Sequence, residues 1–223
     1  MGRVLPILFN TEMVQAVLDD RKTVTRRCVK PQLDTCPSCM HVNYTYDKNA
    51  QNIYCPRCGE PFEPGIKPPY QPGDILYVRE KWNYVYDMDD GDKIVEGTGR
   101  YIYYADASMP FSHWVDPDTG EHKEKMPWRP SIHMPKDAAR IWLKVTDVRV
   151  ERLQDITEEQ AKEEGANWKD GKNIGWEEKM RRSAIERFAE IWNSTIKKAD
   201  FSKCGWDANP WVWVIEFERC GKP

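Results

Sequence analysis

Residues 36–39 read Cys-Pro-Ser-Cys and residues 55–58 read Cys-Pro-Arg-Cys, so fifteen residues separate two Cys-x-x-Cys pairs. This spacing is typical of a closed tetrahedral zinc site whose four thiolate ligands would be Cys36, Cys39, Cys55 and Cys58. The proline inside each pair favours a tight turn whose backbone N–H groups point at sulfur. Two disulfides or four unrelated thiols are the alternatives to a metal. Four cysteine ligands leave no position for water, so we expect a structural rather than a catalytic Zn²⁺.

The segment around these cysteines would depend on the metal for its shape. Residues 31–70 are rich in proline and poor in aliphatic side chains, so they bury little core of their own. Metal binding would supply their folding free energy, roughly 10–16 kcal/mol at neutral pH. We therefore expect a zinc-ribbon insertion over residues 31–70.

Length and composition bound the other possibilities. The chain has 223 residues, of which 40% are hydrophobic, and this suits a single domain over residues 1–223 that carries insertions. Its net charge of −3 gives no global basic field, so any nucleic-acid contact would need a local patch. Ten tryptophans and ten tyrosines are many for this length, and we expect some of them to line a binding surface.

Apolar runs and cysteine usage indicate the compartment. No stretch approaches the roughly 18 consecutive apolar residues of a membrane span, and the N-terminus lacks a signal-peptide pattern. We therefore expect no membrane partner. Seven cysteines, four of them assigned to zinc, favour a reducing cytoplasm. Cys28, Cys204 and Cys220 have no evident partners and are expected to be small buried or half-buried residues.

Hydrophobic periodicity predicts an α+β fold with a small, mostly β core and helices against it. Residues 140–152 alternate as one long strand with a bulge near Asp147. Residues 157–160, Thr-Glu-Glu-Gln, form a capping box that opens a short helix ending near Gly165. The other expected elements are strands over residues 3–9, 75–80, 100–104 and 211–218 and helices over about 11–20 and 176–198. Residues 84–135, with the strand at 100–104 alone, are expected to form a second, loop-rich insertion.

A local excess of positive charge follows the first predicted helix. Residues 21–30 contain five basic side chains and no acid: Arg21, Lys22, Arg26, Arg27 and Lys30. In a chain of net negative charge, this cluster is suited to hold an anion such as phosphate or a carboxylate. A solvated charged edge is the alternative.

The order of these residues adds a resemblance. Residues 20–27, Asp-Arg-Lys-Thr-Val-Thr-Arg-Arg, resemble the signature of the ASCH family, within the PUA-like β-barrel superfamily. Residues 72–76 look like the family's Gly-Asp strand start, residues 157–164 its Thr-x-x-x-Ala-x-x-Glu helix, and residues 213–217 its final strand. The layout also looks like that of ASCH proteins from bacteriophage genomes. The resemblance covers about half of the chain and implies a small PUA-like barrel with flanking helices and an inserted zinc ribbon.

The resemblance also implies an activity. Some small bacterial ASCH proteins are amidohydrolases that remove the acetyl group from the exocyclic amine of acetylated cytidine. Their catalytic lysine, threonine and glutamate fall on Lys22, Thr25 and Glu164 in this sequence. The family's arginine falls on Arg27. This chain departs from the pattern at Asp20, where the family often has glycine, and at the insertion that follows Arg27.

The residue chemistry fits such a reaction. Amide hydrolysis needs a nucleophile, a base and donors for the oxyanion. Thr25 would be the nucleophile and Lys22 its base, if burial and the arginines lower the lysine pKa. Glu164 would orient the lysine or protonate the leaving amine. The expected substrate contacts are Arg21, Arg26, Arg27 and Trp82, the last by stacking. Because residues 22 and 25 of a straight strand face opposite sides, Lys22 must lie in the preceding turn.

Purely structural roles for these residues, and two other functions, are alternatives to this activity. Glu164 lies in an acid-rich helix, where a carboxylate is commonly just solvated, and Lys22 would then be a surface charge. A second function is a non-catalytic reader of RNA or of a modified nucleotide. A third is an interaction protein whose zinc module and aromatic loops bind a host protein.

Overall fold

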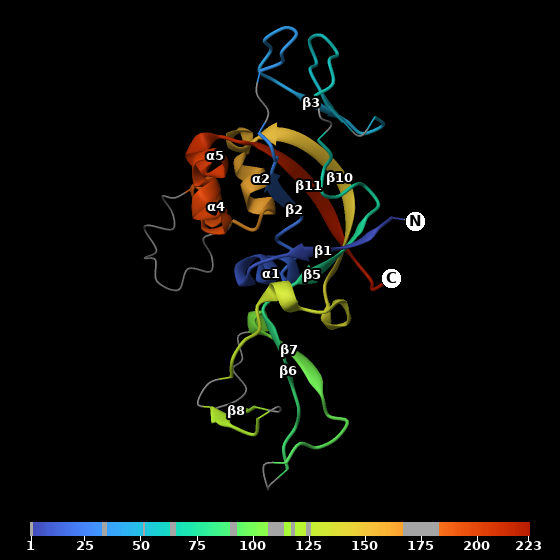
Figure 1. The fold of residues 1–223 in the computed structure, drawn as a ribbon, viewed down its shortest axis with the longest axis vertical. Helices are drawn as coiled ribbons and strands as arrows, with labels where there is room; N and C mark the ends of the chain where they lie inside the picture. The colour runs from blue at the N-terminus through green and yellow to red at the C-terminus, as the bar shows by residue number, and fades with distance from the viewer. Residues whose placement is uncertain are drawn as a thin grey trace.

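The computed structural model describes residues 2–32, 35–50, 52–62, 66–89, 93–106, 114–116, 119–123, 126–166 and 183–223. Figure 1 shows a central sheet with helices on it and two extensions at opposite ends of the long axis. The strands are β1 (Val4–Leu8), β2 (Val24–Cys28), β3 (Thr45–Asp47), β4 (Asn52–Tyr54), β5 (Ile75–Arg79), β6 (Trp82–Val85), β7 (Arg100–Tyr103), β8 (Trp114–Val115), β9 (His122–Lys123), β10 (Trp142–Arg152) and β11 (Trp211–Cys220). The helices are α1 (Thr11–Leu18), α2 (Glu158–Glu163), α4 (Ala184–Thr195) and α5 (Phe201–Cys204).

The central sheet has five strands in the order β1-β5-β10-β11-β2. β1 runs parallel to β5, and the other pairs are antiparallel. The long pairing of β10 with β11 shifts register between Val145 and Asp147, which confirms the predicted bulge. A bulge increases local twist, so it helps these long strands curve around the core.

The sheet is open, so the expected closed barrel is wrong. β1 and β2 are its two edges, and within the part of the chain that the structure describes no strand pairing joins them. Side-chain hydrogen bonds to β1 carbonyls take the place of hydrogen bonds from a neighbouring strand. The Tyr70 hydroxyl donates to the Pro6 carbonyl at 2.8 Å, and Arg27 Nη2 donates to the Leu8 carbonyl at 3.2 Å. The edge carbonyls of β1 are therefore satisfied without a neighbouring strand.

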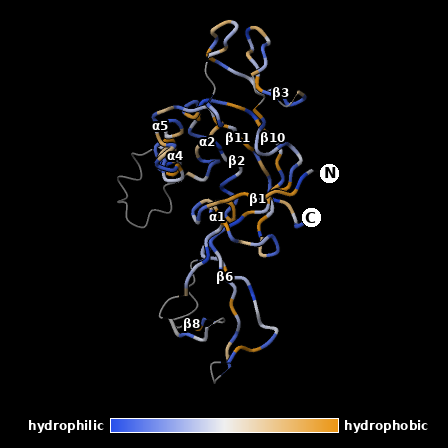
Figure 2. Tube along the Cα trace, in the orientation of Figure 1, coloured by the Kyte–Doolittle hydropathy of each residue, from blue (hydrophilic) through white to orange (hydrophobic). Residues whose placement is uncertain are grey.

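Alternation along β11 divides the core between the two faces of the sheet. Val212 and Val214 pack with Phe188 and Trp192 of α4, under the helices. Trp213, which lies between them, points to the other face and joins a cluster with Val14 of α1. Full burial of such aliphatic side chains contributes about 1.5–3 kcal/mol each. Hydrophobic residues run through the sheet and α1 in Figure 2.

The predicted starts of α1 and α2 are confirmed by their caps, whereas α4 starts later than predicted, at Ala184. Asn10 Oδ1 accepts from the Met13 N–H at 2.9 Å and begins α1. Thr157 and Gln160 form the predicted capping box of α2. α4 begins at a second capping box, Ser183 with Glu186. The predicted helix over 176–198 is thus shorter at its C-terminal end, and residues 176–182 lie outside the described residues.

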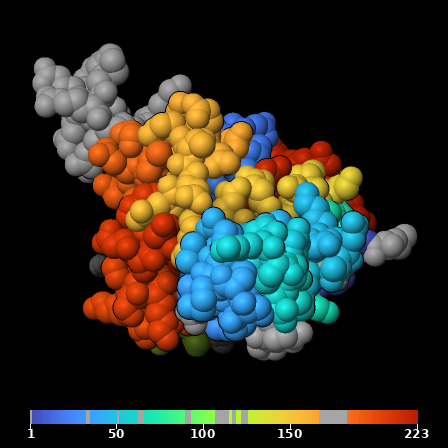
Figure 3. All heavy atoms as spheres, turned by 90° about the horizontal axis from the view of Figure 1, so that it is seen from above, coloured from blue at the N-terminus to red at the C-terminus, as the bar shows by residue number. Residues whose placement is uncertain are grey.

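The segment around the four cysteines forms a small module against the sheet. Its β3–β4 hairpin packs on β10 and β11, with Tyr46 edge-on to Trp213 at 5.1 Å and Tyr44 edge-on to Trp211 at 5.9 Å between ring centroids. Figure 3, seen from that end, shows the module as one compact body beside β10. The module therefore shares its apolar contacts with the core of the sheet.

The second insertion is more ordered than expected. In place of loops with a single strand, β6 and β7 form a hairpin, and β8 and β9 form another. Trp82 pairs with Tyr103 and Tyr84 with Tyr101, so large rings gather on one face of the first hairpin. Cross-strand aromatic pairs of this kind stabilise hairpins. β6 was not predicted because it is only four residues long and runs into a segment rich in Tyr, Asp and Gly.

Candidate functional site

Three of the predicted site residues, Lys22, Arg26 and Glu164, form a buried ion cluster at the turn that follows α1. Lys22 Nζ lies 2.6 Å from Glu164 Oε2, and Arg26 Nη1 lies 3.1 Å from Glu164 Oε1. The side chains of Lys22 and Arg26 are 0% exposed, and that of Glu164 is 4% exposed. One carboxylate therefore serves two enclosed cations, which is why none of the three is a free surface charge.

Local backbone geometry places Lys22 in this cluster. Asp20 adopts a left-handed conformation, with φ of 55°, and reverses the chain after α1. Lys22 then lies in the turn before β2, bridged to Glu164 at the end of α2. Gly165 lets the two helices approach, because a Cβ there would lie 2.7 Å from Ala16 Cβ. The turn position that the sequence argument required for Lys22 is the one observed.

The Lys22 ammonium is fully engaged. It donates to the Val24 carbonyl at 2.7 Å, to the Glu164 carbonyl at 3.0 Å and to the Glu164 carboxylate at 2.6 Å. Burial lowers the pKa of Lys22, Glu164 opposes that effect, and Arg27 and Arg26 add to the lowering. A lysine so placed gives up its proton more readily than a solvated one.

Thr25 and Arg27 occupy the opposite face of β2 from Arg26. Arg27 Nη1 donates to Thr25 Oγ1 at 3.1 Å. The Phe9 ring lies under both Lys22 Nζ and Arg27, at 5.5 and 5.9 Å from its centroid. Among the described residues no hydrogen bond joins Thr25 to Lys22 or Glu164. Thr25 is 1% exposed, so its hydroxyl is next to the ion cluster but closed to solvent.

Two other predicted substrate contacts lie apart from this cluster. Arg21 is at the surface of the turn, where it pairs with Asp19 at 2.9 Å. Trp82 is buried in the hairpin at the other end of the molecule, against Tyr101 and under Arg129. It belongs to a separate hydrophobic cluster. The structure does not bring Trp82 to the predicted site.

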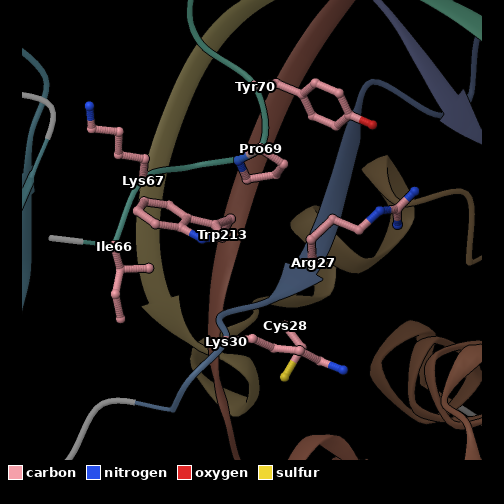
Figure 4. Close-up of a pocket in the computed structure, with 8 residues that line it drawn as sticks. All are labelled: Arg27, Cys28, Lys30, Ile66, Lys67, Pro69, Tyr70 and Trp213. Atoms are coloured by element: carbon pink, nitrogen blue, oxygen red, sulfur yellow. The ribbon is translucent and has the colours of Figure 1, made fainter. Parts of the chain in front are cut away.

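A hollow of about 290 Å³ opens on the face of β2 that carries Arg27. It is lined by Arg27, Cys28, Lys30, Ile66, Lys67, Pro69, Tyr70 and Trp213 (Figure 4). The lining comes from β2, from the segment that follows the cysteine module, and from β11. Trp213 is 2% exposed and forms the floor, while Lys30 and Lys67 are exposed at the rim.

Of the residues that line this hollow, sequence reasoning singled out Arg27 and Lys30 but not Trp213, Lys67 or Tyr70. Trp213 meets Arg27 because the two residues are directly paired in the ladder between β11 and β2. Lys67 and Tyr70 arrive from beyond the cysteine module. Pairing between distant strands is not visible in local periodicity, and the only available signal was the basic run over residues 21–30.

The four predicted metal ligands converge. The sulfur atoms of Cys36, Cys39, Cys55 and Cys58 all lie within 4.8 Å of one another. Cys36 and Cys58 are 3.6 Å apart at sulfur, and Cys39 and Cys55 are 3.5 Å apart. A tetrahedral zinc with bonds of about 2.3 Å needs sulfurs about 3.8 Å apart. The cluster can therefore hold a metal ion such as zinc.

The two halves of the cluster repeat the same turn. The N–H of Met40 donates to the Cys36 carbonyl at 2.8 Å, and that of Gly59 donates to the Cys55 carbonyl at 2.9 Å. Met40 and Gly59 both adopt positive φ, 57° and 76°. Burial raises the pKa of Cys55, but backbone N–H groups of Cys58 and Arg57 outweigh it and lower the pKa to about 7. Backbone N–H groups also lower the pKa values of Cys39 and Cys58, but burial and contacts with neighbouring thiols outweigh them and raise both, that of Cys58 to about 12. Without a metal, the thiolate form is therefore favoured at Cys55 and not at Cys39 or Cys58.

The structure corrects the prediction that Cys28 and Cys204 have no partners. Their sulfurs form a disulfide across 176 residues of sequence, between β2 and α5. Cys220 is a free thiol. The partner of Cys28 could not be found from spacing because the contact depends on how α5 packs beside β2.

No protein-family model, curated protein or solved structure matched the chain. None of the described helices has both the length and the apolar character needed to cross a membrane.

Proposed function

We propose that the protein binds RNA or a modified nucleotide in the hollow between β2, residues 66–70 and β11. The observation that carries this proposal is that three cationic residues, Arg27, Lys30 and Lys67, line one hollow together with the rings of Trp213 and Tyr70. Cationic side chains bind phosphate, and rings bind a nucleobase of any sequence through its flat face. The overall acidity of the chain confines such binding to this local patch.

The hollow is favoured over the ion cluster because a ligand can reach it. Lys22, Thr25 and Glu164 are each no more than 6% exposed, whereas the rim lysines face solvent. A ligand entering the hollow would pass the exposed Lys30 and Lys67 before it reaches Arg27. Arg27 is also the residue that matches the ASCH arginine, so the ASCH resemblance and the hollow agree on one side chain.

In this proposal the four cysteines hold a structural Zn²⁺ that supports one wall of the hollow. Ile66, Lys67 and Tyr70 follow the module along the chain, and Tyr46 of the module packs on the floor residue Trp213. The metal would stabilise the wall by fixing the module, with no part in chemistry.

Salt-dependent binding tests this function. We expect labelled single-stranded RNA to bind at low salt and to weaken as salt rises, because each phosphate contact releases counterions. The Lys67→Glu variant should bind about tenfold more weakly and lose about one unit of the log–log salt slope. The Lys222→Glu variant, with the same charge change at the exposed C-terminus, is the matched control. Binding that ignores salt, or equal loss in both variants, would refute the site.

A deacylase acting on acylated cytidine is the second candidate. The specific observation is that Arg27 lines the hollow and donates to Thr25, beside a buried lysine of lowered pKa. In this scheme Lys22 first loses a proton to solvent, which its lowered pKa favours, and the neutral amine then takes the Thr25 hydroxyl proton as Thr25 Oγ attacks the amide carbon. The cytidine amine leaves with a proton passed through Glu164, and water then hydrolyses the threonine ester.

Turnover of acetylated cytidine, followed by chromatography, tests the second candidate. We expect wild-type protein to release cytidine and Thr25→Val to release none, because valine matches threonine in shape but has no nucleophile. Thr25→Val should keep its RNA affinity. No release by the wild type would leave binding as the sole function, and undiminished release by Thr25→Val would rule out Thr25 as the nucleophile.

A further inference from the structure

The disulfide between Cys28 and Cys204 lies at the wall of the hollow. Cys28 is the β2 residue next to Arg27, and it lines the hollow directly (Figure 4). Two residues further on, Lys30 pairs with Asp200 at 2.6 Å, just before α5. The β2 side of the hollow is therefore tied to residues 198–204 by one covalent bond and one exposed ion pair.

The two cysteine systems of the chain need opposite redox states. The four-cysteine cluster binds metal only as thiolates, so it persists only where cysteines stay reduced. The same surroundings present thiol reductants to the Cys28–Cys204 bond. Cys204 is 3% exposed, whereas Cys28 is half-buried, so Cys28 is the more accessible residue of the bonded pair.

We propose that the Cys28–Cys204 bond is a redox latch that sets the affinity of the hollow for its ligand. The inference rests on the proposed function of the hollow. A thiolate attacks Cys28 Sγ, the bond to Cys204 breaks, and Cys204 leaves as a thiolate that takes a proton from water. A second thiol then displaces Cys28 from the mixed disulfide. Two electrons enter the protein, and the reductant leaves as its own disulfide.

The contacts on each side of the bond indicate what reduction would release. Cys204 stays with α4, because its carbonyl accepts from Trp192 Nε1 at 2.7 Å. Cys28 stays in the sheet, because it is paired with Val212 of β11. Reduction leaves the exposed Lys30–Asp200 pair as the polar link between the two parts at this point, and exposed pairs hold little. The seam between β2 and α5 is thus the place that loosens, and Lys30 on the rim moves with it.

Binding in glutathione buffers of graded reduced-to-oxidised ratio tests the latch. Alkylation followed by mass spectrometry reports the state of Cys28 and Cys204, and metal content is checked in every buffer. We expect labelled single-stranded RNA to bind severalfold more tightly to the oxidised protein. The double variant Cys28→Ser/Cys204→Ser should bind like the reduced protein in all buffers, and Cys220→Ser should respond like the wild type.

A second readout separates failure of the latch from failure of the proposed function. Hydrogen exchange over residues 198–206 should speed up on reduction whether or not RNA binds. Faster exchange with no RNA binding in either state would support the latch as a conformational device and refute the proposed ligand. Unchanged exchange, equal RNA affinity in both states, or a pair that never oxidises would overturn the latch.

Discussion

Replacing Glu164 by alanine is expected to destabilise the protein by about 3–5 kcal/mol, because it leaves buried charges without their partner. Lys22 loses its carboxylate partner, and Arg26 keeps only a longer pair with Glu151 at 3.6 Å and a hydrogen bond to Gln160 at 3.1 Å. Neither Lys22 nor Arg26 has any side-chain exposure through which water could replace Glu164. Urea unfolding monitored by tryptophan fluorescence measures the change. The loss is large against the total stability of about 5–15 kcal/mol that is usual for a domain.

Glu163→Ala is the matched control for this prediction. Glu163 precedes Glu164 in the same helix, but its side chain is exposed, so its loss should change stability by no more than about 0.5 kcal/mol. The Glu164→Gln variant should also be destabilised, because it leaves Lys22 charged and buried. The double variant Lys22→Met/Glu164→Gln should be more stable than Glu164→Gln alone, since both members of the ion pair are then replaced by uncharged groups of similar size. Equal stability of Glu164→Ala and Glu163→Ala would show that the cluster is not a buried ion network.

Removal of the metal is expected to have the second large effect. The folding free energy of a structural zinc module is roughly 10–16 kcal/mol, so the Cys36→Ser/Cys55→Ser variant should lose the folded structure of residues 36–50 and 52–60. Both mutated positions are buried ligands, one from each turn. Metal analysis should give about one zinc per wild-type chain and none in the variant.

The damage should be confined to one side of the molecule. Hydrogen exchange of backbone amides should rise over residues 36–50 and 52–60, including Tyr44 and Tyr46, whose rings pack on Trp211 and Trp213 of β11. The amides of α4, which packs on the other face of β11, should stay protected. RNA binding should fall because the 66–70 wall loses its support. Cys220→Ser, which removes a thiol outside the cluster, is the control. Zinc well below one per chain in wild-type protein would contradict the assignment.

Local patterns predicted the parts of the fold that depend on neighbours in sequence. The alternation of residues 140–152 gave β10 with its bulge, and the capping box at Thr157 gave the start of α2. The Cys-x-x-Cys pairs gave the cluster because each pair makes its own turn. Lys22 lies in the turn after α1, the position that the alternation of a straight strand required, and pairs with Glu164.

Contacts between distant segments could not be predicted in this way. The barrel was expected to close, but whether β1 meets β2 depends on what lies between the two edges. Trp213 faces Arg27 through strand register, and Lys67 reaches the hollow after a whole module. The disulfide between Cys28 and Cys204 depends on packing between elements 176 residues apart. Each of these features depends on how distant segments pack together, and no local pattern in the sequence indicates that packing.

The unpaired border of β1 has a consequence for the behaviour of the molecule in concentrated solution. A bare strand border is a template on which a neighbouring molecule can add its own strand, and this is how many β proteins begin to aggregate. Here Pro6 has no N–H to offer, and the carbonyls of Pro6 and Leu8 already accept from Tyr70 and Arg27. The border that prevents the sheet from closing is thereby also made a poor starting point for self-association.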